Sequence, residues 1–216
     1  MKKARLFDFK RFPMDLGRLV CAPLLLIFRM KRLTVDGKPY KGKLKGPAVI
    51  VANHTGFVDP FTTGVCFWYR RMYFLASEEV MKGKFRSLLL KGMGCIRIDR
   101  TAFDIKAIHQ AVDVLKGGRL VSIFPQGQIQ SDSAIDHIKS GAALIALQSG
   151  AQIVPVYIPK AKHFFSRRVA VIADPIVMDE EMRAGGMRQI DALTSKMRDS
   201  MNRCMAACEE MQAATK

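Results

Sequence analysis

Six short apolar runs, separated by turn residues and helical stretches, restrict the fold of this chain more than any other feature. They cover residues 48–52, 72–76, 95–98, 120–124, 153–158 and 169–173. The first run, Ala-Val-Ile-Val-Ala, contains no polar residue, which is typical of a strand buried on both faces of a sheet. Such runs alternating with helices predict an α/β fold with a mostly parallel or mixed sheet flanked by helices.

Three helices are expected between and after these strands. Apolar residues recur at helical spacing over residues 102–115 and again from near Met187 toward the C-terminus. A further helix is expected over residues 134–148. The chain has 216 residues and no repeat or long linker, which fits one continuous domain.

The N-terminal part is distinguished by its charge. Residues 1–46 hold thirteen Lys or Arg against three Asp, in a chain whose net charge is +16. The apolar run 19–28 is interrupted by Pro23 and is shorter than the roughly 18 residues that a membrane-spanning helix needs. We therefore expect residues 1–40 to form a basic, apolar helical segment that lies on an anionic membrane surface, and residues 41–216 to form the α/β domain. A core helix followed by a solvated basic loop is the alternative.

The five cysteines are scattered and mostly lie in apolar stretches, which indicates reduced core thiols in a cytosolic protein. No cluster of His, Cys, Asp and Glu has the spacing of metal ligands. Neither a metal ion nor a cofactor is expected.

A histidine and an aspartate follow the first strand closely. His54 and Asp59 are five residues apart. In a helix they would point about 140° apart, because each residue turns about 100°, so they meet only where the backbone is not helical. Gly56 permits such a segment. Asp59 would then hold one imidazole nitrogen while the other takes a proton from a substrate. A purely structural pair is the alternative.

Three later segments accompany this Asn-His-x₄-Asp-Pro motif. Residues 94–100 form an apolar strand that ends in Asp-Arg, residues 124–127 read Phe-Pro-Gln-Gly, and residues 153–156 read Ile-Val-Pro-Val. In order and spacing, the four blocks resemble the signatures of the lysophosphatidic acid acyltransferase family, the 1-acyl-sn-glycerol-3-phosphate acyltransferases. Lys139-Ser-Gly-Ala also resembles that family's Lys-x-Gly-Ala. The resemblance covers roughly residues 45–175.

The resemblance implies transfer of a fatty acyl group from a thioester donor, acyl-CoA or acyl carrier protein, to the free hydroxyl of a lysolipid. The expected acceptor is 1-acyl-sn-glycerol-3-phosphate, which would give phosphatidic acid for phospholipid synthesis. His54 would be the general base, oriented by Asp59. No Gly-x-Ser-x-Gly motif points to a covalent acyl-enzyme. The expected location is the cytoplasmic face of the cell membrane, as a peripheral or monotopic protein.

The resemblance also implies which residues bind the acceptor. Arg100 matches the arginine of the second block, and guanidinium groups suit phosphate. The candidate substrate-binding residues are Asn53, Arg97, Arg100, Gln126, Gly127 and Lys139. Surface charge on an edge strand is the alternative interpretation of the two arginines.

The third block departs from the family pattern Phe-Pro-Glu-Gly-Thr-Arg-Ser. Gln126 replaces the glutamate and Ile129 the arginine, so a carboxylate and a phosphate contact are lost. A lipid-surface-binding homologue that uses another lysolipid, or that has lost activity, is therefore the alternative function. A nucleic-acid partner is not expected, because no helix-turn-helix or zinc-finger pattern accompanies the basic charge.

Overall fold

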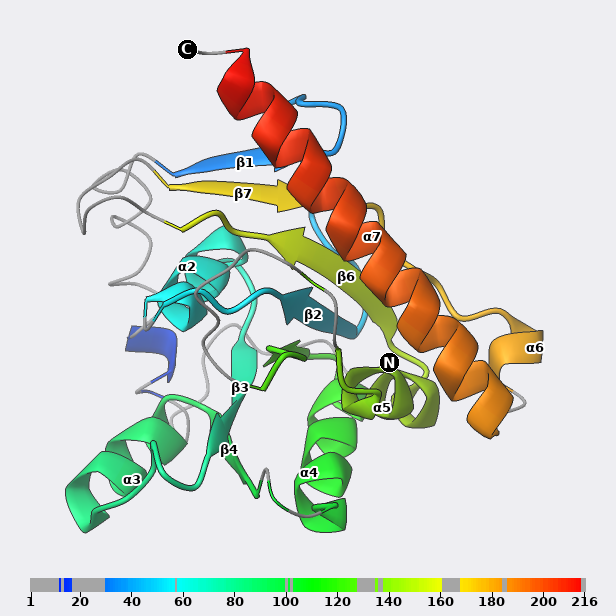
Figure 1. Ribbon diagram of the computed structural model, residues 1–216. Coiled ribbons are helices and arrows are strands. Elements are labelled where there is room, and N and C mark those ends of the chain that lie inside the picture. Colours follow the sequence, from blue (N-terminus) through cyan, green and yellow to red (C-terminus); the bar gives the residue numbers. More distant parts are fainter. Residues whose placement is uncertain are drawn as a thin grey trace.

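The computed structural model describes residues 12, 14–16, 30–56, 58–99, 101, 103–127, 135, 138–160, 168–183 and 186–214. Within them, one seven-stranded sheet has the order β1-β7-β6-β2-β5-β3-β4 (Figure 1). The strands are β1 (Lys31–Thr34), β2 (Ala48–Ala52), β3 (Met72–Ser77), β4 (Cys95–Ile98), β5 (Leu120–Ile123), β6 (Gln152–Tyr157) and β7 (Val169–Ile172). The helices are α2 (Asp59–Cys66), α3 (Lys84–Gly92), α4 (Ile105–Lys116), α5 (Gly141–Ser149), α6 (Glu180–Arg183) and α7 (Met187–Ala213).

Most of the sheet is parallel. The five neighbouring strands β6-β2-β5-β3-β4 run in one direction. Strand β7 pairs antiparallel with β6, and β1 pairs parallel with β7, so these two run the opposite way. The predicted mixed α/β sheet is confirmed. Because the five parallel strands all end at the same edge, the loops that follow them gather there.

Helices cover both faces of the sheet, and β2 lies between the two cores. Val49 and Val51 belong to the core that contains residues of α4, α5 and α7. Ile50 belongs to the opposite core, with Cys66 and Phe67 at the end of α2. All residues of β2 are buried, as a central strand covered on both faces requires. Each of its large side chains contributes about 1.5–3 kcal/mol by leaving water.

The six predicted strands form within one residue of their expected ends, and α7 begins at Met187 as expected. Helix α4 begins later than expected, because the Asp104 side chain accepts the N–H of Ala107 and caps the helix there. The prediction of a helix from residue 134 is wrong at its start. Residues 135 and 138–140 are not helical, and α5 begins at Gly141.

The expected helical segment over residues 1–40 needs correction. Residues 31–34 form strand β1 rather than helix. The buried Asp15 accepts hydrogen bonds from Arg71, at 2.8 and 2.6 Å, so this part of the chain is joined to the α/β domain. Most of residues 1–29 lie outside the described residues, and their membrane association stays a prediction. Among the helices that the structure describes, none combines the length and the apolar character needed to cross a membrane.

Candidate active site

Loops from three parallel strands meet at the carboxyl edge of the sheet. His54 follows β2, the turn 124–127 follows β5, and Ile158 follows β6. Hydrogen bonds join these loops directly: the N–H of His54 to Gln126, and the amide of Asn53 to Ile158. In open α/β sheets this edge is where ligands bind.

His54 and Asp59 lie in contact, and residues 54–56 between them are not helical, which is the condition that the sequence set for a contact. Nδ1 of His54 is 3.2 Å from Oδ2 of Asp59. The same oxygen accepts the backbone N–H groups of Thr55, at 2.6 Å, and Gly56, at 2.8 Å. The loop is therefore wrapped around one buried carboxylate, which stands at the first position of α2. With Nδ1 held by Asp59, Nε2 is the ring nitrogen left to accept a proton from a ligand.

Two residues of the Phe-Pro-Gln-Gly turn hold His54 from the side of β5. Oε1 of Gln126 accepts the backbone N–H of His54 at 2.9 Å. The Phe124 ring stacks on the imidazole, with centroids 4.5 Å apart and planes inclined by 28°. Neither contact was predicted from the sequence, although Phe124 and Gln126 both belong to the third block of the family pattern. Gln126 was predicted to bind substrate, but its side chain holds the backbone N–H of His54 instead.

Gly127 and Lys139, both predicted site residues, lie against each other. Gly127 has a φ of +74°, which glycine adopts without strain. The N–H of Lys139 donates to the Pro125 carbonyl at 3.0 Å and ties the two segments together. A Cβ placed on Gly127 would lie 3.4 Å from Cε of Lys139, so the glycine leaves space for the lysine side chain.

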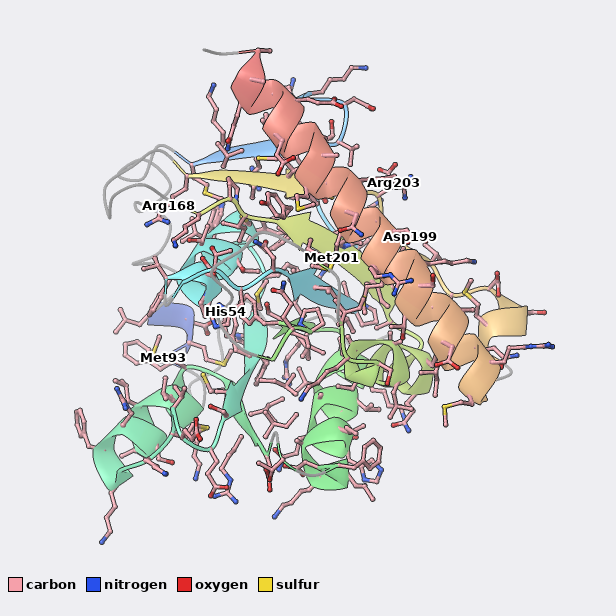
Figure 2. All side chains as sticks on the ribbon, viewed as in Figure 1. His54, Met93, Arg168, Asp199, Met201 and Arg203 are labelled. Atoms are coloured by element: carbon pink, nitrogen blue, oxygen red, sulfur yellow. The ribbon has the colours of Figure 1, made fainter. Side chains whose placement is uncertain are left out.

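A cavity of about 860 Å³ lies beside His54, a size typical of small-molecule sites. Its wall is mostly apolar and comes from α2, β3, β4, α5 and the segment around α3. Gly127 and Lys139 also line it. Figure 2 labels two wall residues, His54 and Met93, on the side of the molecule away from α7. The imidazole therefore faces a space suited to an apolar ligand.

The other predicted binding residues are placed differently. Asn53 is buried, and its side-chain amide exchanges two hydrogen bonds with the backbone of Ile158, at 2.8 and 2.7 Å. It thereby ties the ends of β2 and β6 together. Arg97 lies on the exposed surface, 3.1 Å from Glu78. Neither residue contributes to the described cavity wall. Arg100 lies outside the described residues.

The thiols that the structure describes are poor nucleophiles. Burial raises the pKa of Cys66 and of Cys204 to about 12. Cys95 lines the cavity, but burial raises its pKa to about 11. At neutral pH these side chains carry their protons, and the thiolate is the reactive form. Within the described residues, no group of three His, Cys, Asp or Glu side chains could hold a metal ion.

The mixed α/β sheet places His54 at the wall of an apolar cavity, with the buried Asp59 behind it, and this arrangement is typical of an enzyme with an α/β fold. Comparison with known families is consistent with this class. Residues 32–159 match the family model described as Acyltransferase. The match covers more than half of the chain, so this protein belongs to the acyltransferase family.

Individual relatives are similar over shorter stretches. The chain is 32% identical over 111 residues to a lyso-ornithine lipid O-acyltransferase from Rhodobacter capsulatus, covering 50% of this chain and 37% of the relative. It is 32% identical over 84 residues to a 1-acyl-sn-glycerol-3-phosphate acyltransferase from Bacillus subtilis, covering 39% of this chain and 42% of the relative. The chain thus aligns with less than half the length of each.

A solved structure shares the fold. The crystal structure of the 1-acyl-sn-glycerophosphate (LPA) acyltransferase PlsC from Thermotoga maritima superimposes with a TM-score of 0.60. The match covers 89% of this chain and 80% of that chain, at 15% sequence identity. At that identity the likeness concerns the fold alone.

Proposed function

We propose that this protein is an O-acyltransferase that moves a fatty acyl group from a thioester donor to the free hydroxyl of a lysolipid. The observation that carries the proposal is the contact between His54 Nδ1 and Asp59 Oδ2 at the wall of the apolar cavity. Membership of the acyltransferase family supports the same reaction class.

In the proposed reaction, His54 acts as general base. An alcohol is a weak nucleophile at pH 7, so a base within hydrogen-bond reach must take its proton as it attacks the thioester carbonyl. Nε2 of His54 accepts that proton, and Asp59 stabilises the imidazolium that forms. The tetrahedral intermediate then collapses, the C–S bond breaks, and the leaving sulfur receives the proton from His54.

The oxyanion of this intermediate needs hydrogen-bond donors. The N–H groups of residues 54–56 are engaged by Gln126 and Asp59, so they do not serve this purpose in the described arrangement. Lys139 is a cation on the cavity wall next to Gly127. We assign it either to the oxyanion or to an anionic acceptor headgroup, while the apolar wall receives an acyl chain.

The proposed acceptor is 1-acyl-sn-glycerol-3-phosphate, the substrate in the name of the Bacillus subtilis relative. Arg100, at the end of the second block, is the sequence-predicted phosphate ligand. Ile129 stands where the family pattern has a further arginine, which favours a second candidate acceptor without phosphate. The Rhodobacter capsulatus relative is named for such a lipid, since ornithine is an amino acid.

We further propose that the enzyme works as a peripheral protein on an anionic membrane, at the cytoplasmic face. The net charge of +16 fits an anionic leaflet. It equally fits acyl-CoA and acyl carrier protein, because both donors are acidic, so charge does not choose between them.

Identification of the product across a mixed pool of lysolipids tests this proposal. Purified full-length protein is incubated with acyl-CoA or acyl carrier protein thioesters, and the products are analysed by mass spectrometry. We expect phosphatidic acid to dominate. Acylation of a phosphate-free lysolipid instead would support the second acceptor. Absence of acylation from every combination would support the lipid-binding homologue without turnover.

A further inference from the structure

We propose that helix α3 is a membrane-docking surface that places the mouth of the cavity against the bilayer. Three of its four large apolar side chains are exposed to solvent: Phe85 is 81% exposed, Leu88 is 73% exposed and Leu89 is 52% exposed. No residue of α3 is fully buried. In Figure 1, α3 lies at the end of the molecule remote from α7 and projects beyond the edge strand β4.

The exposed residues of α3 share one face of the helix. Residues 85, 88 and 89 stand at positions i, i+3 and i+4, which are neighbours on a helix surface. Ser87 and Leu90 on the other side are half-buried, and Leu90 lines the cavity. The helix therefore keeps one side on the protein and presents its more apolar side outward, the reverse of a core-packing helix.

Cations border this exposed apolar face. Lys84 and Lys91 flank it on one side and Arg86 on the other, given a turn of about 100° per residue. Lys82 precedes the helix, and residues 80–98 contain no Asp or Glu. An apolar face between basic side chains is the pattern of a helix that lies in the interface of an anionic leaflet.

The same segment forms part of the wall of the cavity. Val80 and Met93, on either side of α3, line the cavity together with Leu90, and His54 lines it as well. Figure 2 shows Met93 on the same side of the molecule as His54. A lipid that leaves the bilayer at α3 would reach the cavity along apolar side chains. Binding of α3 to a bilayer does not depend on the proposed function; only the delivery of a lipid substrate to His54 does.

A bilayer fits this surface better than a protein does. In a symmetric pair of α3 helices, Lys84, Arg86 and Lys91 would face the same cations of the second copy, which disfavours the contact. An acidic carrier protein would match the cations alone. An anionic bilayer accommodates the cations at its headgroups and the apolar side chains below them.

Quenching of a tryptophan placed in α3 tests the proposal directly. Leu88→Trp is compared with Met187→Trp, whose parent side chain is equally exposed, at 73%, at the start of α7. Both are made in a Trp68→Phe background and mixed with phosphatidylglycerol-containing vesicles of brominated phosphatidylcholine. If Trp68→Phe does not fold, Trp68 is kept and its signal subtracted. We expect strong quenching at position 88 and little at 187. Equal quenching at both positions would overturn the proposal.

A second measurement separates α3 from any other lipid contact. The triple variant Phe85→Ser, Leu88→Ser and Leu89→Ser should bind these vesicles at least about tenfold more weakly, because it removes the apolar face. Met187→Ser is the matched control and should bind normally. Unchanged vesicle binding by the triple variant would contradict membrane docking. So would a wild-type protein that is a dimer and becomes a monomer in the triple variant, because α3 would then bind a second copy. A variant that loses binding to acyl carrier protein and keeps binding to vesicles would also contradict it. Tryptophan quenching and vesicle binding do not depend on turnover. Failure of the membrane-docking proposal can therefore be distinguished from failure of the proposed acyl transfer.

Discussion

At the scale of single residues, the site depends on Asp59. Its Oδ2 accepts from His54 Nδ1 and from the N–H groups of Thr55 and Gly56, so one carboxylate both shapes the loop and orients the base. Its position as the first residue of α2 adds the favourable field of a helix N-terminus. We infer that the loop and the catalytic pair form together.

Asp59→Asn tests the charge separately from the shape. The amide oxygen of Asn keeps an acceptor for the backbone N–H groups, while the negative charge beside the imidazole is lost. A hydrogen bond to a charged group contributes about 1.5–3 kcal/mol, so we expect kcat to fall roughly 10- to 150-fold with little change in melting temperature. Steady-state kinetics and thermal denaturation measure this. An unchanged kcat would show that Asp59 only shapes the loop.

The role of Gln126 differs from the expectation that it binds substrate. Gln126→Leu removes the acceptor of the His54 N–H and leaves this backbone donor without its partner. The loss lowers the free energy of unfolding by about 1–3 kcal/mol. We expect kcat to fall with little change in KM, since Gln126 holds the backbone of His54 and is not among the residues that line the described cavity. Gln126→Glu keeps an acceptor oxygen and should restore most of the rate. A change confined to KM would instead support direct substrate binding.

At the scale of elements, buried strands were predictable and the surface helix α3 was not. Strand β2 is an uninterrupted apolar run because both of its faces are covered. Helix α3 turns three of its four large apolar side chains outward, so its pattern does not predict core packing. Ile135 and Ile138 stand at helical spacing from residues of α5, and this spacing led to the prediction of a helix from residue 134. Ile135 is nevertheless buried in the core from a position that is not helical.

The same scale explains which parts of the site the sequence could predict. His54 and Asp59 are close in the chain, so the sequence allowed a contact wherever the short segment between them is not helical. The bonds from His54 to Gln126 and from Asn53 to Ile158 join residues 72 and 105 positions apart. They exist because β2 lies between β5 and β6, and strand order is not readable from local patterns.

Asn53→Ala tests the link between β2 and β6. The substitution leaves the buried N–H and carbonyl of Ile158 without the Asn53 partners. We expect a loss of about 2 kcal/mol of unfolding free energy, which corresponds to a fall of about 4–8 °C in Tm for a chain of this size. Calorimetry of the variant measures it. Wild-type Tm combined with a raised KM would point to substrate binding instead.

At the scale of the whole molecule, His54 and the proposed membrane-docking helix α3 line the same cavity. The loops at the carboxyl edge of the parallel strands supply the base, and the cavity extends from it to the segment around α3. Met14 also lines this cavity, and the adjacent Asp15 is paired with Arg71. The N-terminal segment therefore contributes to the α/β domain as well as to the proposed membrane surface.

In the proposed reaction His54 takes the proton of the acceptor hydroxyl. Lysolipid-dependent release of thiol from acyl-CoA by the His54→Ala variant tests this role directly. The exposed His109 of α4 provides the matched control variant, His109→Ala. We expect His54→Ala to lose about 10²- to 10⁴-fold in rate with its fold retained, and His109→Ala to remain near wild type. A near-wild-type rate in a folded His54→Ala protein would show that His54 is not the general base.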